Sequence, residues 1–449
     1  MAAGRDKYSG PSMKRGTQVG VAALLAALVA GAALWLSLRS GGPRARGPMA
    51  HQAYVWQRAW TPEVRRAIGG HADELAGLVA LGAEISWSAG RPVLVRVAID
   101  HELLKSLRGP VGLALRVGGY SGPFTPDAEA TKAVLSAARG LLDQSRAAGL
   151  TLSELQIDFD CPESKLDGYR AWVELLRRQA APTPVVVTAL PSWLDRPAAR
   201  ALLEAADGYV LQVHSLVRPA GPDAMTPLCD PAAAVKAVEK AARLGRPFRV
   251  ALPTYGYVAA FDSAGKFLGI SAEGPAPNWP ADARRAEIHS DPAALAALVR
   301  QWTADRPACM TGIIWYRLPN DEDKMNWRWA TIKEVMAGRT PVADLRVRAE
   351  RPETRLREIV LENAGTADAP LDVTVTVRWD KARLVAADAI GGFERVEPSP
   401  PGTTDGKTGL VLKGQAPEGR LRPGEKKRIG WLRLSEDKEV VAHVQRSGP

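Results

Sequence analysis

The sequence predicts an α/β protein: a (β/α)8 barrel of the TIM type, followed by a small antiparallel β-sandwich. Two observations favour the barrel. Short apolar segments recur eight times between residues 51 and 340, and amphipathic segments with helix start and stop signals lie between them. A third observation favours the sandwich, because from residue 341 onward the helical patterns stop and segments with alternating apolar residues follow.

The eight strand segments are mostly continuous apolar runs, which are typical of parallel strands buried on both faces. A further strand-like run, residues 93–99, could replace the second strand or pair with it. A doubly wound open sheet is the alternative architecture, but no glycine-rich phosphate loop follows the first strand. The expected strands are residues 53–57, 83–87, 112–117, 155–160, 185–190, 209–214, 249–254 and 312–317.

Capping residues mark several of the intervening helices. An N-cap residue followed by proline at the first helical position predicts a helix start. Gly149 and Gly245 suit the ends of two of these helices. The predicted starts are Thr125-Pro126, Asp230-Pro231 and Asp291-Pro292.

The N-terminal region predicts a membrane anchor. Residues 19–38 are almost purely apolar, and twenty helical residues span about 30 Å, the thickness of a bilayer core. Basic residues within residues 1–18 predict that this end is cytoplasmic, and residues 39–50 form a Gly/Pro-rich linker. A cleaved signal peptide is the alternative, although a cleavable apolar region is usually about 7–15 residues long. Either way, we expect the rest of the chain to be exported.

The boundary between the barrel (51–340) and the sandwich (341–449) is expected near residues 338–344. Clusters of turn residues at 363–365, 398–402 and 423–424 separate the sandwich strands, which is typical of an immunoglobulin- or fibronectin-like domain. Trp379 and Trp431 suit either the core of this domain or a carbohydrate-binding surface, and we favour the core.

Charge and cysteine content limit the function classes. The formal net charge is +10, but the basic residues are scattered, so nucleic acid is not expected as a partner. Three cysteines without zinc-site spacing make no disulfide framework and predict no metal site. Cys161 and Cys229 belong to the same end of the barrel, where they could pair. We expect no cofactor.

The candidate active site lies at the carboxyl ends of the strands, as in other barrels of this type. Asp158 and Asp160 are two residues apart on the fourth strand and therefore face the same side. Two neighbouring carboxylates raise one pKa, which suits acid–base chemistry. Aromatic and polar residues at other strand ends suit the binding of a polysaccharide or oligosaccharide. These candidates are Trp56, Arg116, Trp193, Gln212, His214, Tyr255, Tyr257, Trp315 and Arg317.

The strand motifs resemble known families. Residues 158–160, 211–214, 252–257 and 312–315 look like the ordered motifs of chitinase-like barrels, glycoside hydrolase family 18. Over about residues 50–440, the motifs at 54–56, 156–162, 211–215 and 253–257 more closely resemble the bacterial domain of unknown function 3142. The first resemblance implies a glycosidase and the second implies no activity. Together with the apolar run, a bacterial family implies a single-pass location in the inner membrane, with the main domains periplasmic or extracytoplasmic.

One departure from the chitinase-like pattern concerns the acid. Those enzymes place a glutamate two residues after the second aspartate, where this sequence has Pro162. Glu163 comes one residue too late, so its side chain points the other way. Glu273, between the last two strands, could replace the acid. Our hypothesis is that Asp160 or Glu273 protonates the glycosidic oxygen and Asp158 stabilises the developing positive charge. The alternatives are a non-catalytic glycan-binding protein and an envelope scaffold.

Overall fold

The computed structural model describes residues 42–216, 218–219, 221–222, 226–272, 277–396, 408–415 and 419–446. Among these residues, eight parallel strands close a barrel in chain order, because β2 pairs with both β3 and β14. The closed ring confirms the predicted barrel and excludes the open sheet. The strands are β2 (Ala50–Val55), β3 (Leu78–Ser88), β5 (Val111–Val117), β6 (Glu154–Phe159), β7 (Val185–Ala189), β8 (Gly208–Gln212), β9 (Phe248–Pro253) and β14 (Met310–Tyr316).

Helices surround the barrel, and their starts test the capping signals. Asp230 and Asp291 are N-caps, each accepting hydrogen bonds from two backbone amides, as predicted. The start predicted at Thr125-Pro126 is wrong: the helix begins at Glu129, because Phe124 packs against Trp172 with 4.7 Å between ring centroids and holds the preceding segment as a loop. The helices are α2 (Pro62–His71), α3 (His101–Ser106), α4 (Glu129–Ala147), α5 (Leu166–Ala180), α6 (Pro197–Ala205), α7 (Pro231–Ala242), α8 (Pro292–Ala304) and α9 (Trp329–Met336).

Short elements complete the barrel wall. They are the 3-10 turns η1 (Ala72–Glu74), η2 (Glu163–Lys165) and η3 (Pro191–Trp193), and the strand pair β1 (Arg44–Ala45) and β13 (Arg306–Pro307). The extra strand-like run forms β4 (Arg91–Arg96), which pairs antiparallel with β3, one of its two predicted roles.

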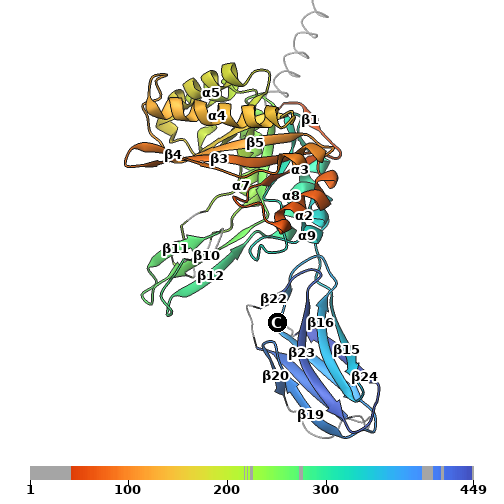
Figure 1. Ribbon diagram of the computed structural model, residues 1–449. Helices are drawn as coiled ribbons and strands as arrows, with labels where there is room; N and C mark the ends of the chain where they lie inside the picture. The colour runs from red at the N-terminus through yellow and green to blue at the C-terminus, as the bar shows by residue number, and fades with distance from the viewer. Residues whose placement is uncertain are drawn as a thin grey trace, which may run out of the picture.

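An antiparallel sheet is inserted between β9 and α8. It consists of β11 (Phe267–Ser271), β10 (Gly256–Phe261) and β12 (Arg284–His289), in that order. The sheet follows β9 directly and so starts at the carboxyl end of that strand, and Figure 1 shows it projecting away from the barrel. The insertion therefore stands where it can form a wall of the barrel mouth.

The C-terminal part forms two facing antiparallel sheets around a separate apolar core that includes Val375, Trp379 and Leu432. Trp379 is 2% exposed and its Nε1 donates to the carbonyl of Ala382, which is the core position expected for it. One sheet contains β15 (Leu345–Glu353), β16 (Leu356–Asn363), β23 (Lys426–Leu434) and β19 (Leu384–Ala389). The other contains β20 (Phe393–Val396), β21 (Thr408–Gly414), β18 (Val373–Trp379) and β24 (Val440–Arg446), and β17 (Ala369–Pro370) pairs with β22 (Arg420–Leu421).

The predicted location in the bacterial inner membrane requires correction. In the part of the chain that the structure describes, no helix is long and apolar enough to cross a bilayer. The anchor predicted over residues 19–38, and the cytoplasmic segment predicted over residues 1–18, lie outside the described residues.

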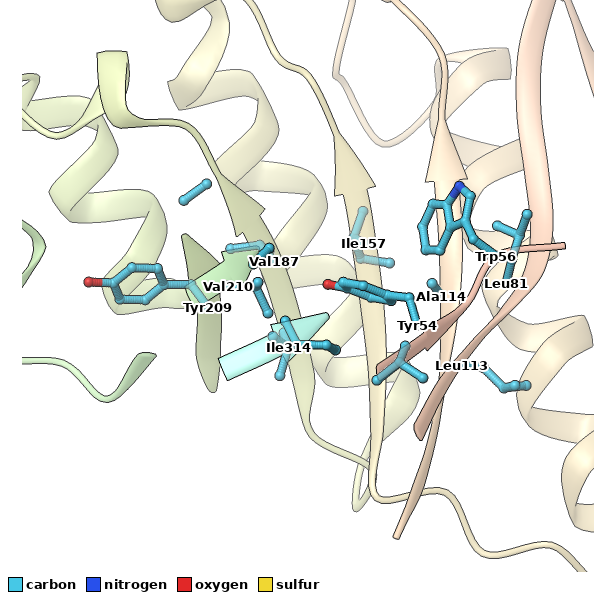
Figure 2. Close-up of a cluster of buried hydrophobic side chains, with 14 of the residues drawn as sticks. Tyr54, Trp56, Leu81, Leu113, Ala114, Ile157, Val187, Tyr209, Val210 and Ile314 are labelled. Carbon is cyan, nitrogen blue, oxygen red and sulfur yellow. The ribbon is translucent and has the colours of Figure 1, made fainter. Parts of the chain in front are cut away.

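The barrel core follows the inward–outward alternation of its strands. Tyr54 on β2 reaches Gln156 on β6 across the interior, where its hydroxyl donates to Oε1 over 2.8 Å. Tyr209 on β8 faces outward and donates to the carbonyl of Ala241 on α7. Figure 2 shows these opposite directions, with Tyr54 among the strands and Tyr209 turned away from them toward a helix.

Candidate functional site

A column of polar side chains runs along β6 through the barrel interior. Gln156 lies in its middle and donates from Nε2 to Oε1 of Glu154 over 2.7 Å. At the amino end of the strands, Arg249 of β9 forms two hydrogen bonds with Glu154, of 2.9 and 2.7 Å. These hydrogen bonds occupy the polar groups at the amino end of the barrel interior. Asp158, the next inward-facing residue of β6 toward the mouth, is therefore the carboxyl group available for chemistry.

Asp158 is partly buried, and its pKa is raised to about 6. Burial is the main cause, because it penalises the charged form, and repulsion from Asp160 adds to it. Arg116 and a 2.9 Å hydrogen bond donated by Thr188 act in the opposite direction. A carboxyl group at this position is partly protonated near neutral pH.

Asp160 is exposed, one residue beyond the end of β6. The two carboxyl groups predicted as a pair therefore occupy different environments: Asp158 sits inside the barrel and Asp160 at its rim. Such a difference between neighbouring carboxyls is what divided acid–base roles need.

Alternating charges run from Asp158 along the neighbouring strands β5 and β3 to the end of β2. Arg116 on β5 lies 3.9 Å from Glu84 on β3, and Arg58, just after β2, donates from Nη2 to Oε1 of Glu84 over 3.0 Å. Of these residues, Asp158 and Arg116 were predicted from the sequence. Glu84 and Thr188 were missed. Thr188 is the one polar residue of an otherwise apolar predicted strand, and Glu84 is the charged residue of another, which are the signals that could have found them.

Aromatic rings fill the interior beside this cluster, centred on Tyr316. Its ring centroid lies 5.4 Å from the rings of Trp56, His214 and Tyr255. Burial lowers the pKa of His214 to about 3, so the imidazole is neutral at physiological pH. Neither ring nitrogen has a hydrogen-bond partner in the described structure. Gln212 lies close by and donates from Nε2 to the His214 carbonyl over 3.3 Å. Four of the predicted ligand-binding residues thus lie together, around a tyrosine that was not predicted.

Three predicted ligand-binding aromatics lie elsewhere. Trp315 faces outward, because its neighbour Tyr316 faces inward, and its Nε1 donates to His51 Nδ1 over 3.3 Å. Trp193 is 1% exposed, and Tyr257 is fully buried in the core of the inserted sheet. Packing rather than ligand contact explains all three. Glu273, the predicted alternative acid, lies outside the described residues.

An open cleft with a volume of about 660 Å³ adjoins the charged cluster. Its floor includes Trp56 and Arg58 at the end of β2, and one wall is the inserted sheet with Glu287. The other wall is the loop of residues 317–325, where Arg317 forms an ion pair with Asp323 and both side chains are at most 10% exposed. Arg58 belongs both to the cleft and to the charged cluster, whereas Asp158 and Asp160 do not line the cleft.

The described residues contain no group of three or more His, Cys, Asp or Glu side chains that could hold a metal ion. Cys161, Cys229 and Cys309 are free in the described structure, so the considered Cys161–Cys229 disulfide is not formed. Cys161 is buried, and burial raises the pKa of its thiol to about 12. The side chains around the barrel mouth offer carboxyl groups, guanidinium groups and aromatic rings.

Fold and site together define a TIM-type barrel with a charged mouth, an inserted sheet and a C-terminal β-sandwich. Residues 119–321 match the model of the family described as Domain of unknown function (DUF3142). This match confirms the resemblance to that family seen in the strand motifs. Residues 346–435 match a second family, Domain of unknown function (DUF8456). No curated protein matches the chain.

Solved structures of similar fold include the spore cortex-lytic enzyme SleL of Bacillus cereus, with 11% identity, coverage of 66% of this chain and 75% of SleL, and a TM-score of 0.46. A chitinase of Chromobacterium violaceum is 16% identical, covers 64% of this chain and 99% of its own, and has a TM-score of 0.43. The xylanase-α-amylase inhibitor protein XAIP-I, solved with trehalose, is 11% identical, with coverages of 65% and 99% and a TM-score of 0.37.

Proposed function

We propose that this chain is a glycoside hydrolase-like protein that binds a polysaccharide or oligosaccharide across the barrel mouth and acts on it by carboxylate chemistry. The observation that carries the proposal is the unequal pair at the end of β6. Asp158 is recessed, with its pKa raised to about 6, and Asp160 is exposed at the rim. Glycoside hydrolysis uses two carboxyl groups in different roles.

In the proposed mechanism, Asp160 donates a proton to the glycosidic oxygen as the bond between that oxygen and the anomeric carbon breaks. Asp158, which is mostly ionised above about pH 6, stabilises the positive charge that develops on the sugar ring. Water then adds to the anomeric carbon and returns a proton to Asp160. Glu273 remains the alternative acid within this proposal.

The cleft supports a carbohydrate as the ligand class. Its lining combines apolar side chains, among them Ala59, Val258 and Met325, with amide and charged groups, among them Gln57, Arg58 and Asn320. Sugars need such a combination, because their hydroxyl groups require hydrogen-bond partners and their C–H faces pack on apolar surface.

The proposal is tested by measuring release of reducing sugar from a panel of purified polysaccharides by the full-length protein. We expect release from at least one polysaccharide and a loss of 100-fold or more in Asp160→Asn, the scale of general acid catalysis. Asp167→Asn is the matched control, since Asp167 is an exposed residue in the first turn of α5 and does not line the cleft. Full activity of Asp160→Asn would exclude the proposed acid, and Glu273→Gln would then test the alternative.

A second candidate function is glycan binding without turnover. Pro162 occupies the place where the chitinase-like pattern has its acid, and the next residue, Glu163, accepts a 2.7 Å hydrogen bond from Nε of Arg196. This ion pair engages Glu163 away from Asp160. Saturable binding of an oligosaccharide in calorimetry, with no sugar released from it, would favour this function over hydrolysis.

A further inference from the structure

The cleft wall formed by the loop between β14 and α9 is held from the sandwich side. Arg422, which directly follows β22, donates from Nη1 to the carbonyl of Asp323 over 2.7 Å and from Nη2 to the carbonyl of Asn326. Asp323 is the partner of Arg317 in the cleft wall. One guanidinium group of the sandwich thus fixes two backbone carbonyls of a loop that lines the barrel cleft.

Burial of the Arg422 guanidinium group favours a defined geometry of its contact with the loop. Arg422 is only 9% exposed, and a guanidinium group removed from water is stable only when its N–H groups find acceptors. The two loop carbonyls supply these acceptors. Arg328, at the other end of the loop, donates to Glu425 over 2.7 Å, and Glu425 also accepts a bond from the Arg422 backbone amide. The contact is therefore a closed network rather than one exposed ion pair.

The same end of the sandwich approaches the opposite wall of the cleft. Asp368, next to β17, has a pKa raised by burial, and the charges of Arg422 and of His289 on β12 both oppose this rise. His289 donates or accepts a 3.0 Å hydrogen bond with Glu287, which lines the cleft from the inserted sheet. Asp368 therefore lies close enough to His289 for their charges to interact, which brings this end of the sandwich near the inserted sheet.

We propose that Arg422 is a positioning residue through which the β-sandwich holds loop 317–328 as a wall of the ligand cleft, so that ligand binding in the barrel depends on the sandwich. The sandwich then serves the barrel as a support and is not an independent binding module. The ligand part of this inference rests on the proposed function, whereas the positioning part does not.

The test compares amide hydrogen exchange of full-length wild type and Arg422→Gln. We expect exchange of the amides in residues 317–328 to be at least tenfold faster in the variant, with exchange in β5 to β7 unchanged, because local opening exposes only the segment that lost its contacts. Arg420→Gln is the matched control: Arg420 is exposed on the neighbouring strand β22 and should leave the loop unchanged. Unchanged loop exchange in Arg422→Gln, or equally faster exchange throughout the chain, would overturn the inference.

Binding of an oligosaccharide probe, such as a hexamer of β-1,4-linked N-acetylglucosamine or of glucose, separates this inference from the proposed function. Where wild type binds the probe, Arg422→Gln should bind at least tenfold more weakly, while Arg420→Gln binds normally. Equal affinity of wild type and Arg422→Gln would overturn the dependence on the sandwich. Absence of binding by wild type to all glycans tested would instead count against the proposed function, and loop exchange would still decide whether Arg422 positions the wall.

Discussion

Thr188 on β7 donates a hydrogen bond from Oγ1 to Oδ1 of Asp158 on β6 over 2.9 Å, across neighbouring strands at the barrel mouth. The bond favours the ionised carboxylate, and so does the charge of Arg116. Burial and repulsion from Asp160 nevertheless prevail, since the pKa of Asp158 is raised to about 6. The site therefore maintains a proton-binding group near neutral pH at the expense of stability.

The first prediction concerns the loss of stability that accompanies the raised pKa of Asp158. Because the folded pKa of Asp158 lies above its ordinary value of 3.8, the folded state binds more protons between about pH 4 and 6, and the free energy of unfolding falls as pH rises through this window. Asp158→Asn should therefore match wild type near pH 4 and exceed it by about 2–3 kcal/mol at pH 8. Urea denaturation at both pH values measures the difference, with Asp167→Asn as the exposed control. A stability difference between Asp158→Asn and wild type that does not change with pH would contradict this prediction.

The second prediction concerns the groups that set this pKa. Asp160→Asn removes a repulsive charge and should lower the pKa of Asp158, whereas Arg116→Gln removes an attractive charge and should raise it, each by on the order of one unit. Carboxyl NMR titration of the labelled protein measures both. Shifts of the same sign in the two variants would show that the charges act through a structural change instead.

The sequence was sufficient for the barrel because its signals are local. Buried parallel strands read as apolar runs, and an Asp-Pro pair such as Asp291-Pro292 marks a helix start whatever surrounds it. The inward direction of Asp158 followed from the same reasoning, since one apolar neighbour on each side fixes the alternation of the strand. These features depend on a few residues that are adjacent in the chain.

Which residues belong to the site depends on the face of the strand to which each side chain points. At the end of a strand, the sequence does not fix this alternation. Choosing Trp315 rather than Tyr316 selected the outward neighbour, because adjacent residues point to opposite faces. In β3, an irregularity between Leu81 and Ala83 shifts the register with β5, and Glu84 faces Arg116 only beyond it. The contact of Arg422 with Asp323 joins residues 99 positions apart and has no local signature.

The third prediction concerns the buried ion pair below the site. Arg249 and Glu154 have side chains that are 14% and 11% exposed, and two hydrogen bonds join them. Glu154→Gln leaves the Arg249 charge inside the barrel without its partner, so we expect a loss of about 3–5 kcal/mol of unfolding free energy. Glu102→Gln breaks the exposed Lys105–Glu102 pair and should cost less than about 1 kcal/mol. Chemical denaturation measures both losses. Equal losses of unfolding free energy in Glu154→Gln and Glu102→Gln would contradict the expected difference between a buried and an exposed ion pair.

The fourth prediction concerns the seam where the barrel closes. Gly312 on β14 pairs with Ala50 on β2, and a Cβ atom added to it would lie 2.5 Å from the Ala50 carbonyl oxygen. Backbone on the neighbouring strand cannot move aside as a side chain can, so Gly312→Ala should destabilise the protein by about 1–3 kcal/mol or more.

Gly69 in α2 provides the opposite case, because a Cβ atom there meets nothing within 4 Å and alanine has the higher helix propensity. Gly69→Ala should therefore stabilise the protein by about 0.5–1 kcal/mol. Denaturant midpoints of the two variants, measured against wild type, should move in opposite directions. If Gly312→Ala instead left the midpoint unchanged, the β2 and β14 strands could not be packed as closely as the closed barrel requires.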